Sequence, residues 1–87
     1  LMAQIKIPAV LAGGSASSTV EISGNSLAEV FENHAAEHGS ELRDSVIQDG
    51  EIKEFINVYV DGTEVSDLET TVSDKSQIRV IPAASGG

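Results

Sequence analysis

The sequence predicts an α+β domain in which a small mixed sheet carries one main helix across one of its faces. Three observations predict it. Strand-like alternation opens the chain at residues 3–8 and 19–23, a capped amphipathic segment follows at 26–39, and further strand-like runs occupy 55–60 and 78–82. The 87 residues form a single domain, because a chain of this length has no room for a second core.

The first two runs are predicted to form a β-hairpin. Ile5 and Ile7 alternate with polar neighbours, and Pro8 closes this run because proline cannot donate a hydrogen bond to a sheet. Apolar residues also share one face in the run at 19–23. A glycine- and serine-rich stretch at 11–18 joins the two runs and provides the turn.

Residues 26–39 carry the signals of a complete helix. Ser26 and Glu29 have the spacing of a capping box, in which each side chain accepts a hydrogen bond from a free amide at the helix start. Gly39 supplies the left-handed stop. One side of the helix is predicted to face the core while its acidic side stays in solvent. The residues of the core side recur at spacings of three and four: Leu27, Val30, Phe31, His34, Ala35 and His38.

Residues 40–54 show no clear period. A turn is expected at Asp49-Gly50, because both residue types accept the backbone angles that turns need. Four apolar residues of this stretch can be buried and would anchor it to the core: Leu42, Val46, Ile47 and Ile52.

A second hairpin is predicted in the C-terminal half. Residues 55–60 read FINVYV, which is typical of a strand. Asp61-Gly62 is a dipeptide that a tight hairpin turn needs, because both central residues take a positive φ. A short strand around Val65 would complete the hairpin, and residues 66–77 would follow as an irregular connection.

The last strand begins at Ile78, and its pairing is expected to stop at Pro82. The resulting order of hairpin, helix, strands and last strand is that of the β-grasp fold, in which the first and last strands run side by side in the sheet centre. We therefore expect a β-grasp domain at residues 1–82 and a flexible C-terminal tail at residues 83–87.

The charge and composition exclude several classes of function. Acidic residues outnumber basic ones 14 to 5, and the formal charge of −9 would repel nucleic acid and acidic membranes. It would attract a basic protein partner, although solubility alone explains the excess equally well. The chain has no cysteine, which excludes a disulfide, thiolate metal ligation and a cysteine nucleophile. Without a long apolar run or a secretory signal, a cytoplasmic protein is expected.

The C-terminal tail is the candidate reactive segment. Residues 83–87 carry no large or charged side chain, and fully extended they reach about 17 Å at ~3.3 Å per residue. Glycine lacks a Cβ, so Gly86 and Gly87 can approach a reactive centre closely. A glycine pair arises by chance at a given position only about 0.5% of the time. The α-carboxylate of Gly87 is a poor electrophile until it is activated, for example by adenylation with ATP.

Several of these segments resemble the MoaD/ThiS family of ubiquitin-like sulfur carriers, and the resemblance covers nearly the whole chain. It rests on the hairpin and helix, on EFINVYVDGTEV at 54–65 and on SQIRVIPAASGG at 76–87. The final block is the most specific, because the family typically ends in I-P-x-x-x-G-G. Ser85 stands where alanine or a similar small residue is frequent, and serine still fits a narrow channel.

The resemblance implies that the chain is a co-substrate for other proteins and not an enzyme on its own. An E1-like adenylyltransferase would use ATP and Mg²⁺ to adenylate the Gly87 carboxylate, and the chain itself would bind no cofactor or metal. Sulfur from a desulfurase or from sulfide would then displace AMP and leave a thiocarboxylate. The acceptor would be a sulfur-acceptor enzyme or the large subunit of a synthase, in molybdopterin or cysteine biosynthesis.

Two other functions stay open at this point. A protein modifier would use the same activated Gly87 to form an isopeptide bond with a lysine amine. An inert β-grasp binding module would not use its tail at all.

A docking surface is expected at the root of the tail. If the alternate residues of the strand at 55–60 face the helix, the others lie on the opposite face of the sheet. Aromatic, arginine and aliphatic side chains together are typical of interface anchors, although scattered surface residues of these types are also normal. The predicted partner-binding residues are Phe55, Tyr59, Arg79 and Ile81, with Ser85 in the tail.

Three weaker signals favour structural roles. His34 and His38 have the spacing of metal ligands on a helix, but they lie in phase with the apolar stripe, so at least one is expected to pack under the sheet. Residues 13–17 lack the Lys-Ser/Thr ending of a phosphate loop. Asp61 and Glu64 are expected to be a solvated pair of acids.

Overall fold

A computed structural model describes residues 2–7 and 18–82 of the chain. Two helices and seven strands lie within these residues. In chain order they are β1 (Ala3–Ile7), β2 (Ser18–Ile22), α1 (Leu27–His38), α2 (Glu41–Val46), β3 (Ile47–Gln48), β4 (Glu51–Ile52), β5 (Ile56–Val60), β6 (Thr63–Val65) and β7 (Gln77–Pro82).

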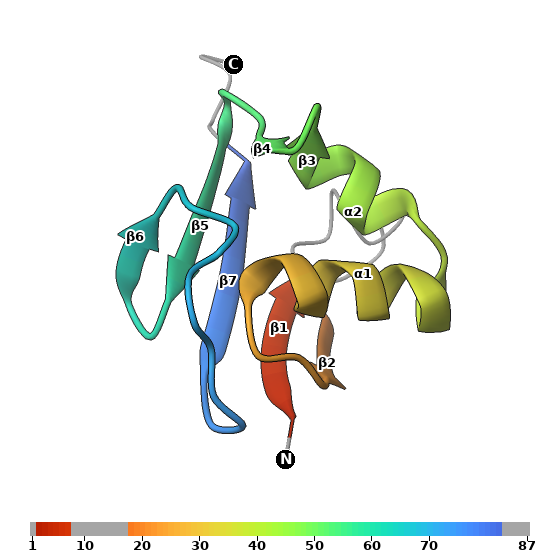
Figure 1. The fold of residues 1–87 in the computed structure, drawn as a ribbon, viewed down its shortest axis with the longest axis vertical. Helices are drawn as coiled ribbons and strands as arrows, with labels where there is room; N and C mark the ends of the chain where they lie inside the picture. The colour runs from red at the N-terminus through yellow and green to blue at the C-terminus, as the bar shows by residue number, and fades with distance from the viewer. Residues whose placement is uncertain (1, 8–17, 83–87) are drawn as a thin grey trace.

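Five strands form one mixed sheet in the order β2-β1-β7-β5-β6, with α1 packed across it (Figure 1). β1 runs parallel to β7, with Ile5 opposite Ile78, while the other neighbours in this sheet are antiparallel. The predicted placement of the first and last strands side by side is therefore confirmed, and so is the β-grasp fold.

The start of α1 is capped largely as predicted. The Ser26 hydroxyl accepts a hydrogen bond from the Glu29 amide at 3.2 Å, and the Glu29 carboxylate accepts one from the Asn25 amide at 3.0 Å. The second bond therefore involves the amide of the residue before the N-cap, Ser26. The next amides of α1 donate to carbonyls of the connection between β6 and β7, including Ala28 to Leu68 at 2.9 Å. This irregular connection is thus held against the helix.

The core lies between α1 and the sheet, where Phe31 is fully buried. The predicted stripe is correct for its first four members, whereas Ala35 is half-buried and His38 is exposed. The prediction for His38 is wrong, because the last turn of α1 leaves the core and residues 36–39 are all exposed. Gly39 ends the helix with the expected positive φ of 92°, but its ψ of 163° is extended and not left-handed helical. The buried apolar residues are Ala3, Ile5, Ile7, Ile22, Leu27, Val30, Phe31, Leu42, Val46, Val58, Val72, Ile78 and Val80.

Both predicted turns are present. Asp49 and Gly50 take φ values of 54° and 77° between β3 and β4, and Asp61 and Gly62 take 51° and 86° between β5 and β6. The sequence predicts no helix in residues 40–54, but the structure forms α2 there. Ile47 and Ile52 face each other in the small β3–β4 sheet.

β7 includes Pro82 as its last residue, opposite Ile56 of β5. β5 itself begins one residue later than predicted, because Phe55 lies in a turn. Neither helix in the described part of the chain has the length and apolar character needed to cross a membrane.

Candidate functional site

The site is built on the face of the sheet away from α1, which we call the outer face. Arg79 and Ile81 are exposed there, because the residues that alternate with them in β7 face the core. Tyr59 of β5 is the register partner of Arg79, and Asn57 is that of Ile81. The strand register therefore places Tyr59, Arg79 and Ile81 on the same face of the sheet, as predicted.

Two large apolar side chains are exposed where β7 ends. Phe55 is 71% exposed and Ile81 is 40% exposed. Phe55 directly precedes Ile56, whose register partner is Pro82, the last described residue. The exposed ring therefore lies near the point from which residues 83–87 continue.

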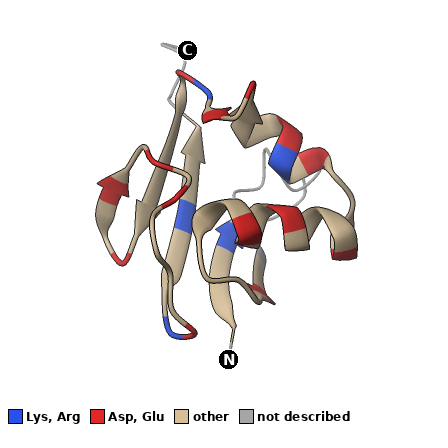
Figure 2. Ribbon diagram, in the orientation of Figure 1, with Lys and Arg blue, Asp and Glu red and all other residues tan. Residues whose placement is uncertain are grey.

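The centre of the outer face is positively charged although the chain as a whole carries −9. Lys6 of β1 is the parallel register partner of Arg79 in β7, and Figure 2 shows basic positions on these two neighbouring strands. In the described residues neither side chain forms an ion pair with a carboxylate. Sequence reasoning missed Lys6, although its alternation with Ile5 and the predicted pairing of the first and last strands pointed to it.

Two acids at the edge of this face or beside it are engaged in hydrogen bonds. Glu64 of β6 is the register partner of Tyr59, and its carboxylate accepts a hydrogen bond of 2.6 Å from the Asn57 side-chain amide. Asp61 accepts one of 2.9 Å from the Gln77 amide. Both acids are exposed, as predicted, but each also fixes local structure.

His34 is a core residue, which confirms the interpretation that at least one histidine packs under the sheet. It is 5% exposed, and its Nδ1 atom has no hydrogen-bond partner among the described residues. Burial lowers the pKa of His34, and the neighbouring His38, at 4.9 Å between ring centroids, lowers that pKa further. In the described ranges, no three His, Asp or Glu side chains gather as a metal ion would require.

The remaining predicted site residues are Ser85, Gly86 and Gly87, and they lie outside the described residues, as do residues 13–17. Their roles stay predictions. The described residues form an outer face with Arg79, Lys6 and Tyr59 at its centre and Ile81 near the end of β7, and the exposed Phe55 lies in the turn just before β5. It has the composition of a protein-binding surface.

The family model described as ThiS family matches residues 5–87, which is almost the entire chain. The chain belongs to the ThiS family. The match runs through the terminal glycine pair, and it confirms the resemblance to MoaD/ThiS-type ubiquitin-like proteins. No curated protein matches this ThiS-family chain.

Solved structures are similar over nearly the full length of the ThiS-family chain. A chain in the crystal structure of the Amycolatopsis orientalis BexX/CysO complex is 27% identical with a TM-score of 0.82, covering 98% of this chain and 99% of that one. Mycobacterium tuberculosis CysO, an antigen, is 26% identical with a TM-score of 0.79, covering 94% and 99%. SAMP1 from Haloferax volcanii is 24% identical with a TM-score of 0.74, and the match covers 100% of both chains. At this identity the similarity supports the fold alone.

Proposed function

We propose that this chain is a sulfur carrier that holds sulfur as a thiocarboxylate at Gly87. The observation that carries the proposal is the ThiS-family match through residue 87, in a chain whose last two residues are glycines. A cysteine-free chain can carry sulfur in this way, because the main-chain carboxylate and not a side chain holds it. The chain would act as a co-substrate and not as an enzyme.

The proposed chemistry has two steps. A carboxylate oxygen of Gly87 attacks the α-phosphorus of Mg²⁺-bound ATP, pyrophosphate leaves, and an acyl-adenylate forms. Hydrosulfide then attacks the carbonyl carbon, the bond to the AMP oxygen breaks, and AMP and a proton leave the thiocarboxylate behind. No oxidant or reductant is needed when sulfide is the sulfur source. Glycine without a Cβ suits both steps, because in the first the α-phosphorus must come close to the carboxylate oxygen and in the second hydrosulfide must reach the carbonyl carbon.

We propose that an E1-like adenylyltransferase docks on the outer face and receives the tail in its nucleotide site. Covering the ring of Phe55 contributes about 2 kcal/mol from burial of apolar surface. Arg79 and Lys6 would contact carboxylates of the partner, which fixes orientation and speeds association more than it adds affinity. The similarity to a chain of the BexX/CysO complex supports the idea of a protein partner.

The sulfur acceptor would be a synthase large subunit or another sulfur-acceptor enzyme, of the molybdopterin or the cysteine type. Because activation consumes ATP, we place the reaction in the cytoplasm. A protein modifier would use the same acyl-adenylate, with a lysine amine in place of sulfide as the attacking group.

Intact mass spectrometry tests the proposal directly. The protein ending at Gly87 is incubated with the activating enzyme, ATP, Mg²⁺ and sulfide. Exchange of one oxygen atom for one sulfur atom is expected, and it should be lost when ATP is omitted or when Gly86 and Gly87 are deleted. Adducts to lysines of other proteins would favour the modifier, and an unchanged mass would contradict both functions. The deletion variant should unfold at the same denaturant concentration as the parent, which separates loss of chemistry from loss of fold.

A further inference from the structure

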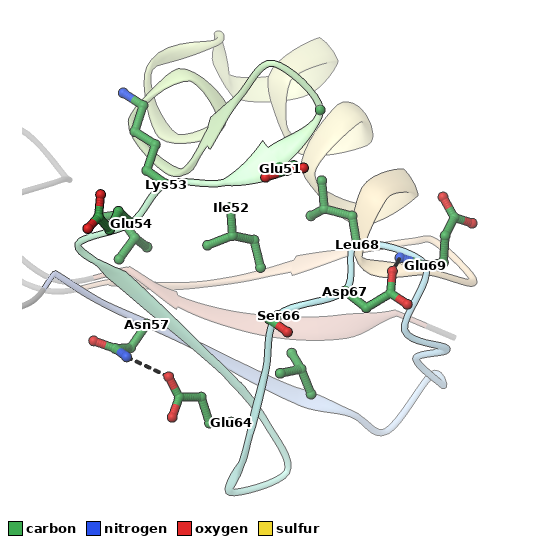
Figure 3. A pocket seen from close by; sticks show the side chains of 13 residues that line it. Glu51, Ile52, Lys53, Glu54, Asn57, Glu64, Ser66, Asp67, Leu68 and Glu69 are labelled. Carbon is green, nitrogen blue, oxygen red and sulfur yellow. Dashed lines mark hydrogen bonds between the residues drawn. The ribbon is translucent and has the colours of Figure 1, made fainter.

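A second surface lies apart from the centre of the outer face. It is a groove of about 610 Å³ between the β3–β4 hairpin, the start of β5, and β6 with the connection that follows it (Figure 3). Its apolar lining comes from partly buried residues that pack against the core with one side: Ile52, Ile56, Val65 and Leu68.

Both walls of the groove are held in place by backbone hydrogen bonds. On one wall the Lys53 amide donates to the Val46 carbonyl at 2.7 Å, which attaches β4 to the end of α2. On the other wall the Leu68 carbonyl accepts from the Ala28 amide at 2.9 Å. The groove is therefore formed before any ligand arrives, and binding does not have to order its walls.

The rim of the groove is acidic. Five carboxylates surround it, against a single lysine, Lys53, whose amine points away from Ile52 in Figure 3. Glu64 and Asp67 accept hydrogen bonds within the protein. The other three acids are exposed, and their carboxylates form no hydrogen bond or ion pair within the described part of the chain: Glu51, Glu54 and Glu69.

We propose that this groove binds an extended segment of a partner protein with one or two aliphatic side chains placed between lysines or arginines. The aliphatic side chains would cover the apolar lining, and the cations would meet the free carboxylates of the rim. The chain's own residues 83–87 do not fit, because they contain neither a basic side chain nor a large aliphatic one. A second copy fits poorly, since two chains of charge −9 repel each other.

The groove adjoins the strand that leads to the C-terminal segment. Ile56 lines the groove and is also the register partner of Pro82. Arg79 and Tyr59 do not line the groove, so a partner could occupy it while another contacts the centre of the outer face. The proposal goes beyond the sulfur-carrier function and does not depend on the chemistry at Gly87.

Amide chemical shifts of the isotope-labelled protein, followed by NMR, test the proposal with three synthetic peptides of equal length. The probe is acetyl-RKLIRK-amide, and the controls are acetyl-RKSSRK-amide, which lacks the aliphatic pair, and acetyl-EDLIED-amide, which reverses the charge. The probe should shift amides of residues 50–54 and 65–69, and its affinity should fall about tenfold or more between ~0.02 and ~0.3 M NaCl. Both controls should bind at least about tenfold more weakly than the probe.

Charge-reversal variants separate the groove from the general acidity of the chain. Glu51→Lys combined with Glu69→Lys should lower affinity for the probe about tenfold, because both carboxylates are free on the rim. Glu21→Lys combined with Glu37→Lys makes the same change of net charge away from the groove and should change affinity less than about twofold. Val65→Thr keeps the side-chain shape while making the groove lining more polar, and should weaken binding of the probe without unfolding the protein.

Four results would overturn the proposal. The first is equal binding of RKSSRK and RKLIRK, which would reduce the groove to a generally acidic surface. The second is equal binding of EDLIED, which would remove the role of charge. The third is no saturable shift with RKLIRK, or shifts confined to residues outside the groove. The fourth is a concentration-dependent shift of groove amides without peptide, which would assign the groove to a second copy of the chain.

Discussion

Replacement of His34 by leucine should stabilise the protein and remove part of its pH dependence. His34 is 5% exposed, and its Nδ1 atom is buried without a hydrogen-bond partner among the described residues. A buried polar atom without a partner costs about 1–3 kcal/mol, so His34→Leu should raise the free energy of unfolding by about 1 kcal/mol at pH 7 after allowance for imperfect packing.

The sign of the pH effect follows from the direction of the pKa shift. Burial lowers the pKa of His34 below its ordinary value of 6.5, His38 lowers it further, and Glu37 opposes them in part. The unfolded chain therefore binds more protons than the folded chain as the pH falls below about 6.5, and stability is lost until the pH passes the folded pKa. One titrating group changes the free energy of unfolding by at most about 1.4 kcal/mol per pH unit. The advantage of His34→Leu over the parent should therefore grow as the pH falls.

Urea unfolding between about pH 5 and pH 8 measures both effects, since protonation of the many carboxylates dominates at lower pH. Far-UV circular dichroism is the suitable signal, because the chain has no tryptophan and one tyrosine. His38→Gln is the matched control, and it should keep most of the pH dependence because burial is the largest cause of the shift. Parallel stability profiles of the parent and His34→Leu would refute the reasoning. If His38→Gln removed the pH dependence of stability completely, the pKa shift of His34 would instead come mainly from its interaction with His38.

Three further predictions concern the core, the second hairpin and the outer face. Phe31→Ala should cost about 3–5 kcal/mol in chemical unfolding, and a loss below about 1 kcal/mol would show that α1 is not the centre of the core. Asp61→Ala loses the hydrogen bond to the Gln77 amide and should cost about 1–3 kcal/mol, whereas Asp61→Asn keeps an oxygen acceptor and should cost less than half as much; equal losses would contradict this role. Phe55→Ala and Arg79→Glu should each change stability by less than about 0.5 kcal/mol but lower kcat/KM for ATP-dependent activation about tenfold, and unchanged activation would argue against docking on the outer face.

Local sequence signals predicted most of the elements because each signal lies within a few residues. The Asp61-Gly62 dipeptide imposes its turn through the positive φ of both residues. The Ser26 cap acts within one helical turn. Such signals do not depend on the rest of the fold, and they were sufficient to place α1 and the five strands of the main sheet in their correct chain order.

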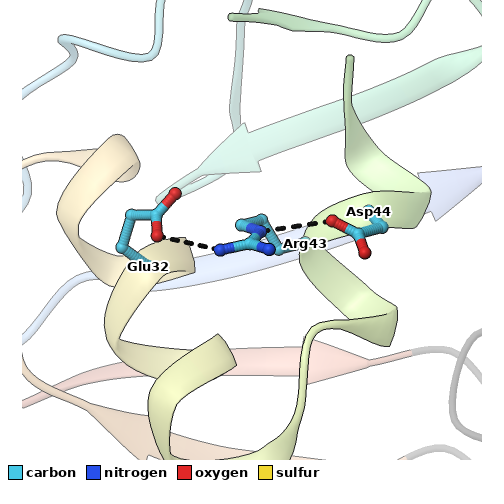
Figure 4. A network of polar contacts seen from close by, with 3 residues as sticks. All are labelled: Glu32, Arg43 and Asp44. Atoms are coloured by element: carbon cyan, nitrogen blue, oxygen red, sulfur yellow. Dashed lines mark hydrogen bonds and ion pairs between the residues drawn. The ribbon is translucent and has the colours of Figure 1, made fainter. Parts of the chain in front are cut away.

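α2 could not be predicted in this way, because tertiary contacts stabilise it. A helix of six residues is too short to show a period and is not stable alone. Its buried residues, Leu42 and Val46, lie one turn apart and belong to the same core as Phe31 of α1. Arg43 connects the two helices, with Nη1 at 2.9 Å from Glu32 on α1 and Nε at 3.2 Å from Asp44 (Figure 4).

The two candidate surfaces differ in how far the sequence reveals them. Tyr59, Arg79 and Ile81 follow from strand alternation, and the pairing of Lys6 with Arg79 requires only that the first and last strands be neighbours. The groove has no comparable signal, because much of its lining comes from residues 50–54 and 66–69, for which the sequence predicts no helix or strand.

A single strand, β5, supplies residues to both surfaces. Ile56 lines the groove with one neighbour, Asn57, while Tyr59 lies beside Arg79 on the outer face. The acidic rim and the basic centre of the outer face should therefore select partner segments of opposite charge. Charge reversal on the rim should then weaken binding of one partner, and charge reversal at Arg79 should weaken binding of the other. In a variant that combines them, each partner's loss of binding free energy should equal its loss in the single variant, and a difference would show that β5 couples the two surfaces.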